Sequence, residues 1–197
     1  MVMAAQTSSI KAVRGLSSRF IVDGFNFVEA ECKSYFLTHY HGDHTTGLHA
    51  GFDLGTIYCS EVTARLVVHD LGVASKLVCV LPLHEWTTVE GVHVMPVDAC
   101  HCPGAVMFFF DDPTAGRRVL HCGDFRAEEC VVESPHLAAA LARGPLDELY
   151  LDTTYCRPTH TFPDQPAVLR DVEAIVRHEL GQERRTLFVV GTYQIGK

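Results

Sequence analysis

Residues able to bind a metal are densest in one short stretch of the chain. It contains three histidines and one aspartate within six positions: His39-Tyr40-His41-Gly42-Asp43-His44. Alternate side chains of an extended segment point the same way, so His39 and His41 can face one ion, and the turn at Gly42 carries the next two side chains to a neighbouring position. Imidazole and carboxylate ligands suit zinc or another divalent first-row metal. The stretch therefore predicts a metal site with a position left open for water.

A site for two ions needs ligands from elsewhere, and two candidates stand where apolar runs give way to glycine-containing loops. His101 lies in Asp98-Ala99-Cys100-His101-Cys102-Pro103-Gly104, and Asp124 lies in His121-Cys122-Gly123-Asp124-Phe125-Arg126. A rigid sheet can present side chains from such strand ends. Asp23 ends a third apolar run and suits a carboxylate that orients the histidine loop rather than a direct ligand.

The elements that must position these residues follow from hydrophobic periodicity and turn signals. Strands are predicted at residues 20–22, 34–38, 56–59, 86–89, 92–97, 105–110, 117–121, 148–151 and 186–190. Helices are predicted at residues 61–71, 137–143 and 164–180, the first capped by Ser60 and closed by Gly72. Strands early and a helix–strand unit late indicate a mixed α/β protein.

Composition narrows the class of protein further. The chain has 197 residues, a formal charge of -8 and 47 % hydrophobic residues, which excludes a disordered polymer and a basic nucleic-acid-coating tail. Its length predicts one domain or a large part of one. The lack of a bilayer-spanning apolar run or a secretory signal predicts a soluble, intracellular protein without membrane partners. In that setting the eight cysteines are expected to be reduced.

Several separated motifs together resemble a known family. The ordered series Asp23, His39-x-His41-x-Asp43-His44, His101 and Asp124 resembles the metallo-β-lactamase superfamily. Five stretches resemble its β-CASP branch of DNA-repair nucleases, the kin of Artemis and Apollo, most nearly the interstrand cross-link repair exonucleases. These stretches are residues 36–39 (FLTH), 101–107 (HCPGAVM), 123–126 (GDFR), 151–156 (LDTTYC) and 191–197 (GTYQIGK).

The resemblance implies a fold and a ligand set. It implies a flexible N-terminus over 1–18, an αββα metallo-β-lactamase sandwich over 19–157, and the beginning of a truncated β-CASP domain over 158–197. The first ion would bind His39, His41, His101 and Asp124; a second, more weakly held ion would bind Asp43 and His44, with Asp124 bridging. Asp152 would match the first acidic motif of the β-CASP region. Because the family's later motif histidines fall beyond residue 197, we expect the chain to be a fragment whose own activity is open.

The same resemblance implies a metal-dependent phosphodiester hydrolase acting on DNA, a 5′-to-3′ exodeoxyribonuclease in cross-link and double-strand break repair. Zn²⁺ would be the cofactor, with Mg²⁺ or Mn²⁺ possible at the second position, and Asp43, His44 and Asp124 would be the catalytic residues. Nuclear location, 5′-phosphorylated or damaged DNA and DNA-repair proteins as partners follow from the family. Two alternatives stay open: another hydrolase of this fold that acts on RNA, a thioester or a lactam, and an incomplete fragment that binds only metal or a partner.

Overall fold

The computed structural model of the chain describes residues 10–27, 29, 31–182, 185–191 and 193–196. It divides into two compact units, one formed by Met1–Asp152 together with Tyr193–Lys197 and the other by Thr153–Thr192. Within the described residues, no helix is long and apolar enough to cross a membrane. The first unit contains every predicted metal-site residue.

The first sheet of this unit is parallel and has the order β1-β2-β3-β4. Its strands are β1 (Phe20–Val22), β2 (Ser34–Phe36), β3 (Thr56–Cys59) and β4 (Val78–Val80). Helix α2 (Glu61–His69) and the short 3-10 turn η1 (Ser75–Leu77) connect β3 to β4. Because the strands are parallel, the loops after β1 and β2 leave the sheet at the same edge.

The second sheet has the order β5-β6-β7-β8-β9 and is antiparallel except for its last pair. Its strands are β5 (Thr87–Val89), β6 (Val92–Asp98), β7 (Val106–Asp112), β8 (Arg117–His121) and β9 (Glu148–Tyr150). Helices α3 (Glu129–Val132) and α4 (Pro135–Ala142) lie between β8 and β9 in the chain. The long β6–β7 pair delivers the loop of His101, and β8 delivers the loop of Asp124.

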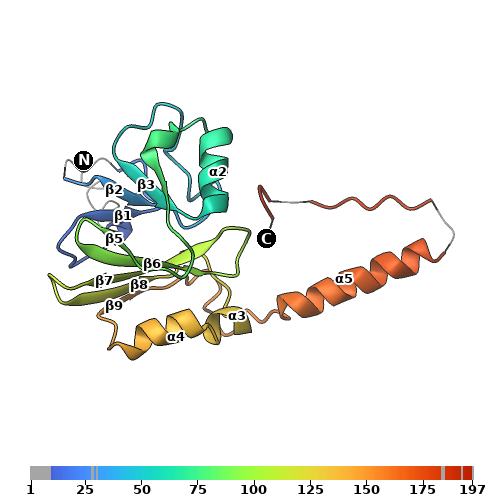
Figure 1. Cartoon of the computed structure of the whole chain (residues 1–197). Helices are drawn as coiled ribbons and strands as arrows, with labels where there is room; N and C mark the ends of the chain where they lie inside the picture. The colour runs from blue at the N-terminus through green and yellow to red at the C-terminus, as the bar shows by residue number, and fades with distance from the viewer. Residues whose placement is uncertain (1–9, 28, 30, 183–184, 192, 197) are drawn as a thin grey trace. The chain divides into compact units, whose positions relative to one another are not determined.

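Three separate hydrophobic clusters show how the layers stack, because the two faces of each central strand contribute to different clusters. On β7, Phe108 and Phe110 pack with Phe20 and Phe36 between the sheets, whereas Phe109 faces a cluster containing Ala140 of α4. The outer face of the first sheet packs with buried residues of α2. The order is therefore helix, sheet, sheet, helix (Figure 1), which confirms the αββα arrangement that the resemblance implied.

Most predicted elements of the first unit are present, with small shifts at their ends. The strand predicted over 34–38 ends at Phe36, and the helix predicted over 61–71 ends at His69, with Gly72 at a positive φ of 70°. The sequence analysis missed η1, β4 and α3, which are only three or four residues long. Short elements of this kind depend on packing rather than on a visible period.

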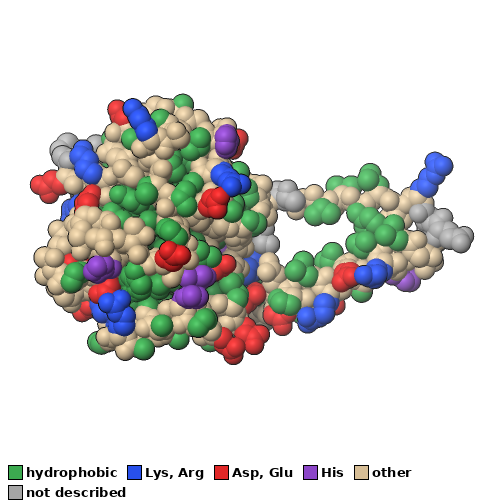
Figure 2. Space-filling view, in the orientation of Figure 1, with side chains coloured by type: hydrophobic (Ala, Val, Ile, Leu, Met, Phe, Trp, Pro, Cys, Tyr) green, Lys and Arg blue, Asp and Glu red, His purple; other side chains and the backbone are tan. Residues whose placement is uncertain are grey.

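The second unit contains helix α5 (Gln165–Leu180), capped by Asp164, whose side chain accepts a hydrogen bond from the backbone N–H of Ala167 at 2.6 Å. The strand predicted over 186–190 is wrong: those residues form no strand, and Leu187, Val189 and Val190 are exposed. An apolar run becomes a strand only beside a partner, and the described part of the chain offers none. Figure 2 shows hydrophobic side chains exposed along this unit.

Two further expectations meet the structure at the edges of the fold. Ala12 and Val13 are buried, and the Val13 N–H donates to the Phe20 carbonyl, so packed structure begins before residue 19; residues 1–9 lie outside the described residues.

The expectation that all thiols are reduced is wrong for one pair, because Cys100 and Cys130 form a disulfide. Thirty positions separate the pair, so their proximity depends on the packing of α3 and is invisible in the sequence.

Candidate metal centre

The histidine loop leaves β2 as buried chain and then turns sharply. His39 and His41 are almost completely buried, and the His41 carbonyl accepts hydrogen bonds from the N–H groups of His44 at 3.0 Å and Thr45 at 2.9 Å. This turn places His44 on the far side of His39, with ring centroids 4.1 Å apart. The turn thus directs His44 to a different place from His41, as a division of the loop into two ligand groups requires.

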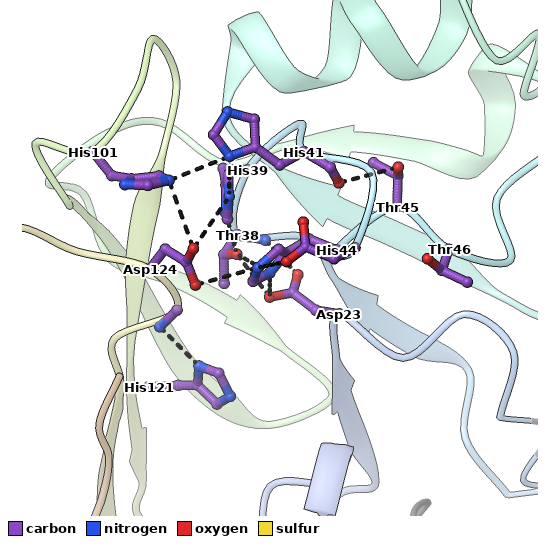
Figure 3. A network of polar contacts seen from close by, with 12 residues as sticks. Asp23, Thr38, His39, His41, His44, Thr45, Thr46, His101, His121 and Asp124 are labelled. Atoms are coloured by element: carbon purple, nitrogen blue, oxygen red, sulfur yellow. Dashed lines mark hydrogen bonds and ion pairs between the residues drawn. The ribbon is translucent and has the colours of Figure 1, made fainter. Parts of the chain in front are cut away.

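The first group joins the loop to His101. His39 Nε2 lies 2.9 Å from His41 Nδ1, and His101 Nε2 lies 3.3 Å from the same His41 atom. Asp124 Oδ2 lies 4.0 Å from His39 Nε2 and 3.7 Å from His101 Nε2. The nitrogens of His39, His41 and His101 thus lie within 4.8 Å of one another, and the Asp124 carboxylate lies beside two of them (Figure 3), a donor set that can bind a metal ion.

The second group shares Asp124. Its Oδ1 lies 3.2 Å from His44 Nε2, and Asp43 Oδ2 lies 3.5 Å from that same nitrogen. The Asp43 carboxylate is largely exposed, at 70 % of its side-chain surface, whereas His44 is mostly buried. The two oxygens of Asp124 thus face different ligand groups, the geometry of a carboxylate that can bridge two ions.

Asp23 and Thr38 orient the rings of two ligands. Asp23 Oδ1 accepts from the Thr38 backbone N–H at 2.8 Å, and Asp23 Oδ2 accepts from the Thr38 hydroxyl at 2.7 Å and from His44 Nδ1 at 2.8 Å. Because the hydroxyl proton goes to Asp23, the Thr38 oxygen accepts from His39 Nδ1 at 3.0 Å. With Nδ1 of each ring held in this way, Nε2 of His39 and, once a metal ion displaces its proton, Nε2 of His44 would be the ligating atoms.

The charges around the centre divide its histidines into two kinds. Burial lowers the pKa of His39 to about 3 and also lowers the pKa of His101. Burial also acts against the charged form of His44, yet its hydrogen bonds to Asp124 and Asp23 raise its pKa to about 10. The hydrogen bond from His44 in turn lowers the pKa of Asp124 to about 2. In the metal-free protein, the positive charge of protonated His44 thus offsets part of the negative charge of Asp23 and Asp124. A divalent ion can take over this role when it binds.

Backbone contacts hold the three ligand loops together. The Val106 N–H at the start of β7 donates to the Thr38 carbonyl at 2.9 Å, and the Arg126 N–H donates to the Ala99 carbonyl at 3.0 Å. Gly123, just before Asp124, has a positive φ of 54°, and a Cβ there would lie 2.7 Å from Cγ2 of Thr38. Only glycine permits this approach, so the loop of Asp124 can lie directly against the loop of His39.

A cavity of about 240 Å³ opens beside the second ligand group. Asp152 lines it together with His44, Asp124, His121 and Lys11. Its volume can hold several waters or a phosphate group, since a water occupies about 30 Å³. The structure therefore brings Asp152 near the centre without placing it among the ligand atoms.

All eight site residues predicted from the sequence meet around this centre: Asp23, His39, Asp43, His44, His41, His101, Asp124 and Asp152. Two roles were not predicted: Thr38 as the link between Asp23 and two ligands, and the Gly196 carbonyl as the acceptor from His41 Nε2 at 3.1 Å. Both residues lie in stretches that carry the family resemblance, 36–39 and 191–197, but spacing alone gives neither residue a contact with the centre.

The chain is 42 % identical to the DNA cross-link repair 1A protein of Gallus gallus over 179 residues and 43 % identical to that of Homo sapiens, in each case over 90 % of this chain. It is 39 % identical to the 5′ exonuclease Apollo of Gallus gallus over 84 % of this chain. It spans only 18 %, 16 % and 34 % of those three relatives. No protein-family model matches the chain.

Among solved structures, a protein of unknown function from Enterococcus faecalis V583 aligns with a TM-score of 0.53 and 19 % identity, covering 79 % of this chain and 41 % of the other. A subclass B3 metallo-β-lactamase from a soil metagenome aligns with a TM-score of 0.43 and 15 % identity. The first likeness supports the fold of this chain and says nothing about its chemistry.

Proposed function

We propose, from the premise that this chain belongs by sequence with the DNA cross-link repair proteins, that it carries the metal centre of a metal-dependent DNA nuclease. The observation that supports this most is the convergence of three imidazole nitrogens and both oxygens of Asp124 from three separate loops. Such a donor set, next to a cavity with room for a phosphate group, suits phosphodiester hydrolysis.

In this proposal His39, His41, His101 and Asp124 hold a zinc ion. Asp43 and His44, with Asp124 between the two groups, hold a second ion, which can be zinc or, because the donors are richer in oxygen, Mg²⁺ or Mn²⁺. When bound, such ions lower the pKa of a water toward about 7 and offset the charge of a phosphoryl group. The ligand geometry of the metal-free protein is preset, since Thr38 and Asp23 hold two of the rings.

The chain's own residues supply the rest of the chemistry. The exposed Asp43 carboxylate lies beside the cavity-lining His44 and can accept a proton from an attacking water. Asp23 keeps the Nδ1 proton of His44, so that His44 cannot turn its Nε2 away from Asp124. Bound divalent ions would offset the negative charge of the carboxylates at the centre itself, and so part of the chain's charge of -8, where the anionic substrate has to approach.

The proposed substrate is DNA with a 5′ phosphate, degraded from that end, in cross-link and double-strand break repair. Two relatives named for cross-link repair and one named a 5′ exonuclease support this choice. Damaged DNA and other repair proteins are the proposed partners, and the nucleus is the proposed location. The chain spans only part of those relatives, so these properties are proposed for the protein in which this centre works.

The test compares Asp124→Asn and the double variant Asp43→Ala, His44→Ala with a matched control, Asp53→Asn, whose carboxylate is exposed and away from the ligand groups. Hydrolysis of 5′-phosphorylated DNA should fall by at least about 100-fold in the first two proteins, with DNA binding kept, and should stay unchanged in the control. Substrates with 5′-hydroxyl DNA, RNA and a thioester run in parallel. Undiminished cleavage by Asp124→Asn, or preferred turnover of RNA or the thioester, contradicts the proposal; metal uptake without any turnover favours an incomplete piece.

A further inference from the structure

A segment far along the chain lies directly against one ligand of the centre. The Gly196 carbonyl oxygen lies 3.1 Å from His41 Nε2, and the Tyr193 ring meets the His41 ring edge-on at a centroid distance of 4.7 Å. We call residues 193–196 the His41 strap. It belongs to the same compact unit as the ligands, although 155 positions separate Gly196 from His41.

His41 differs from the other loop ligands in how its second nitrogen is held. Thr38 holds Nδ1 of His39, and Asp23 holds Nδ1 of His44, so these two rings are fixed by residues that closely follow the strands β2 and β1. His41 points Nδ1 toward the other ligands and must hold its ring through Nε2. Among the described residues, the hydrogen-bond acceptor at that nitrogen is the carbonyl of Gly196.

Packing, as well as this hydrogen bond, holds the strap in place. Ile195 is partly buried and packs against the cluster that contains Tyr35 and Tyr40, under the histidine loop. The Gln194 amide lies 3.7 Å from the point where a side chain of Gly42 would begin. All four residues of the strap thus lie against the ligand loop or the core, so the Gly196 carbonyl is one of several contacts that hold the strap there.

We propose that the His41 strap is a positioning device for the metal centre: its Gly196 carbonyl holds the Nε2 proton of His41 while Tyr193 fixes the ring plane. This inference rests on the proposed metal-binding function of the centre. Outer partners that hold the far nitrogen of a ligating histidine raise its basicity and fix its direction, and losing one costs about 10–100-fold in metal affinity. The centre is therefore complete only when the strap is seated.

The first arm of the test moves the carbonyl without creating a clash. Gly196 has a positive φ of 99°, and an added Cβ would meet no atom within 4 Å, so Gly196→Ala strains only the backbone that carries the carbonyl. Gly191→Ala is the matched control, because that glycine has equally open space and no positive φ. Cobalt affinity, measured by competition with a chelator, should fall about tenfold or more in Gly196→Ala and stay unchanged in Gly191→Ala.

The second arm acts on the ring contact. Tyr193→Ala removes the aromatic edge beside His41, whereas Tyr193→Phe keeps it. We expect weaker cobalt binding in Tyr193→Ala and recovery in Tyr193→Phe. In metal-free protein, the Nε2 proton of His41 should give a slowly exchanging NMR signal that is lost in Gly196→Ala and Tyr193→Ala, while the signals of β7 show that the fold is kept.

The outcomes separate the strap from the proposed function. Equal cobalt affinity and an intact His41 signal in Gly196→Ala and Tyr193→Ala overturn the positioning role, even if the nuclease is active. If the unchanged protein binds no cobalt, the metal-binding function fails, but the His41 signal in the metal-free variants still decides whether the strap holds this ring.

Discussion

The Thr38 hydroxyl is the smallest group on which the arrangement of the centre depends. It donates to Asp23 and accepts from His39, and its oxygen also lies 3.5 Å from Nδ1 of His44. The buried Thr38 oxygen therefore links Asp23, which orients the rings, to His39 in the first ligand group and to His44 in the second. An isosteric change that removes only this oxygen isolates its role.

Replacing Thr38 by valine should leave Asp23 and His39 short of a hydrogen bond in a buried place. The expected cost is about 1–3 kcal/mol in the free energy of unfolding, with metal affinity reduced about 10–100-fold. Ser34→Ala is the control at the other end of β2, since it also removes a buried hydroxyl that donates to a carboxylate, that of Glu90. Denaturant unfolding and metal titration distinguish them: a loss of metal affinity in both variants contradicts a specific role for Thr38.

His121 predicts a pH dependence that does not involve the ligands. Burial lowers its pKa to about 4, and Nδ1 accepts from the Gly123 N–H at 3.2 Å. The unfolded chain takes up this proton near a pKa of about 6.5, before the folded protein does. The stability that the neutral ring contributes is therefore complete above about pH 6.5 and is lost as the pH falls toward about 4.

The measurement is the free energy of unfolding of metal-free protein between pH 4 and pH 7, with His121→Asn as the comparison because its side chain keeps an acceptor near Nδ1 but does not titrate. The unchanged protein should lose roughly 3 kcal/mol more than the variant across this range. Parallel curves for the two proteins show that His121 does not resist protonation in the fold.

At the scale of the elements, the sequence predicts strands well where both faces are apolar or where a turn separates two runs. The run at 105–110 and its return at 117–121 form β7 and β8, which pair in antiparallel register with Phe109 opposite Leu120. It fails for the run at 186–190, which is richer in β-branched residues but has no partner strand among the described residues. Periodicity reports a segment's tendency, whereas pairing depends on residues elsewhere.

The cap of α2 connects an element to the centre. The Ser60 hydroxyl accepts from the Thr63 N–H at 3.4 Å and donates to the Gly104 carbonyl at 2.6 Å, at the end of the loop that carries His101. Ser134 caps α4 in the same way, accepting from the Leu137 N–H at 3.3 Å. The two serines share a capping role, but only Ser60 contacts a ligand loop.

Ser60→Ala and Ser134→Ala should each lower the free energy of unfolding by about 1 kcal/mol, the usual cost of a lost cap. Metal affinity should fall, by up to about tenfold, only in Ser60→Ala, because the Gly104 carbonyl then keeps only the longer hydrogen bond from the Thr63 hydroxyl, at 3.3 Å, and the loop of His101 is held less firmly. Thermal unfolding and cobalt titration test this pair. Should Ser134→Ala weaken metal binding as much as Ser60→Ala, general destabilisation rather than the link to Gly104 is the cause.

At the scale of the molecule, the sequence and the family resemblance predict a set of residues that the fold brings close together, but not the contacts that hold them. Local spacing shows that His39 and His41 share a side, and the family pattern adds His101 and Asp124. The layered packing that brings their loops together, the disulfide of Cys100 and the approach of Gly196 join positions 30 to 155 apart. Such contacts form only in the assembled fold. From the sequence alone, residues that are this far apart can be brought together only by resemblance to a family whose fold is known.

The two units differ in the way their helices are supported, and this difference predicts their dynamics. Helix α2 has nine residues, of which Thr63, Ala64 and Val67 are buried, whereas α5 has sixteen and none is buried. A longer helix is intrinsically more stable, but isolated helices of about 12–15 residues are marginal in water, and packing supplies most helical stability. The shorter helix should therefore be the more protected one.

Hydrogen exchange followed by mass spectrometry tests this order within one sample. Amides of α5 should exchange orders of magnitude faster than those of α2, and those of β7 should be the slowest because they lie in the middle of the second sheet. Adding zinc should slow exchange in the loops of His39 and His101 and leave α5 unchanged, since only the first unit holds the ligands. Protection of α5 equal to that of α2 would mean that its apolar side chains, such as Leu169 and Ile175, are covered in solution by another surface.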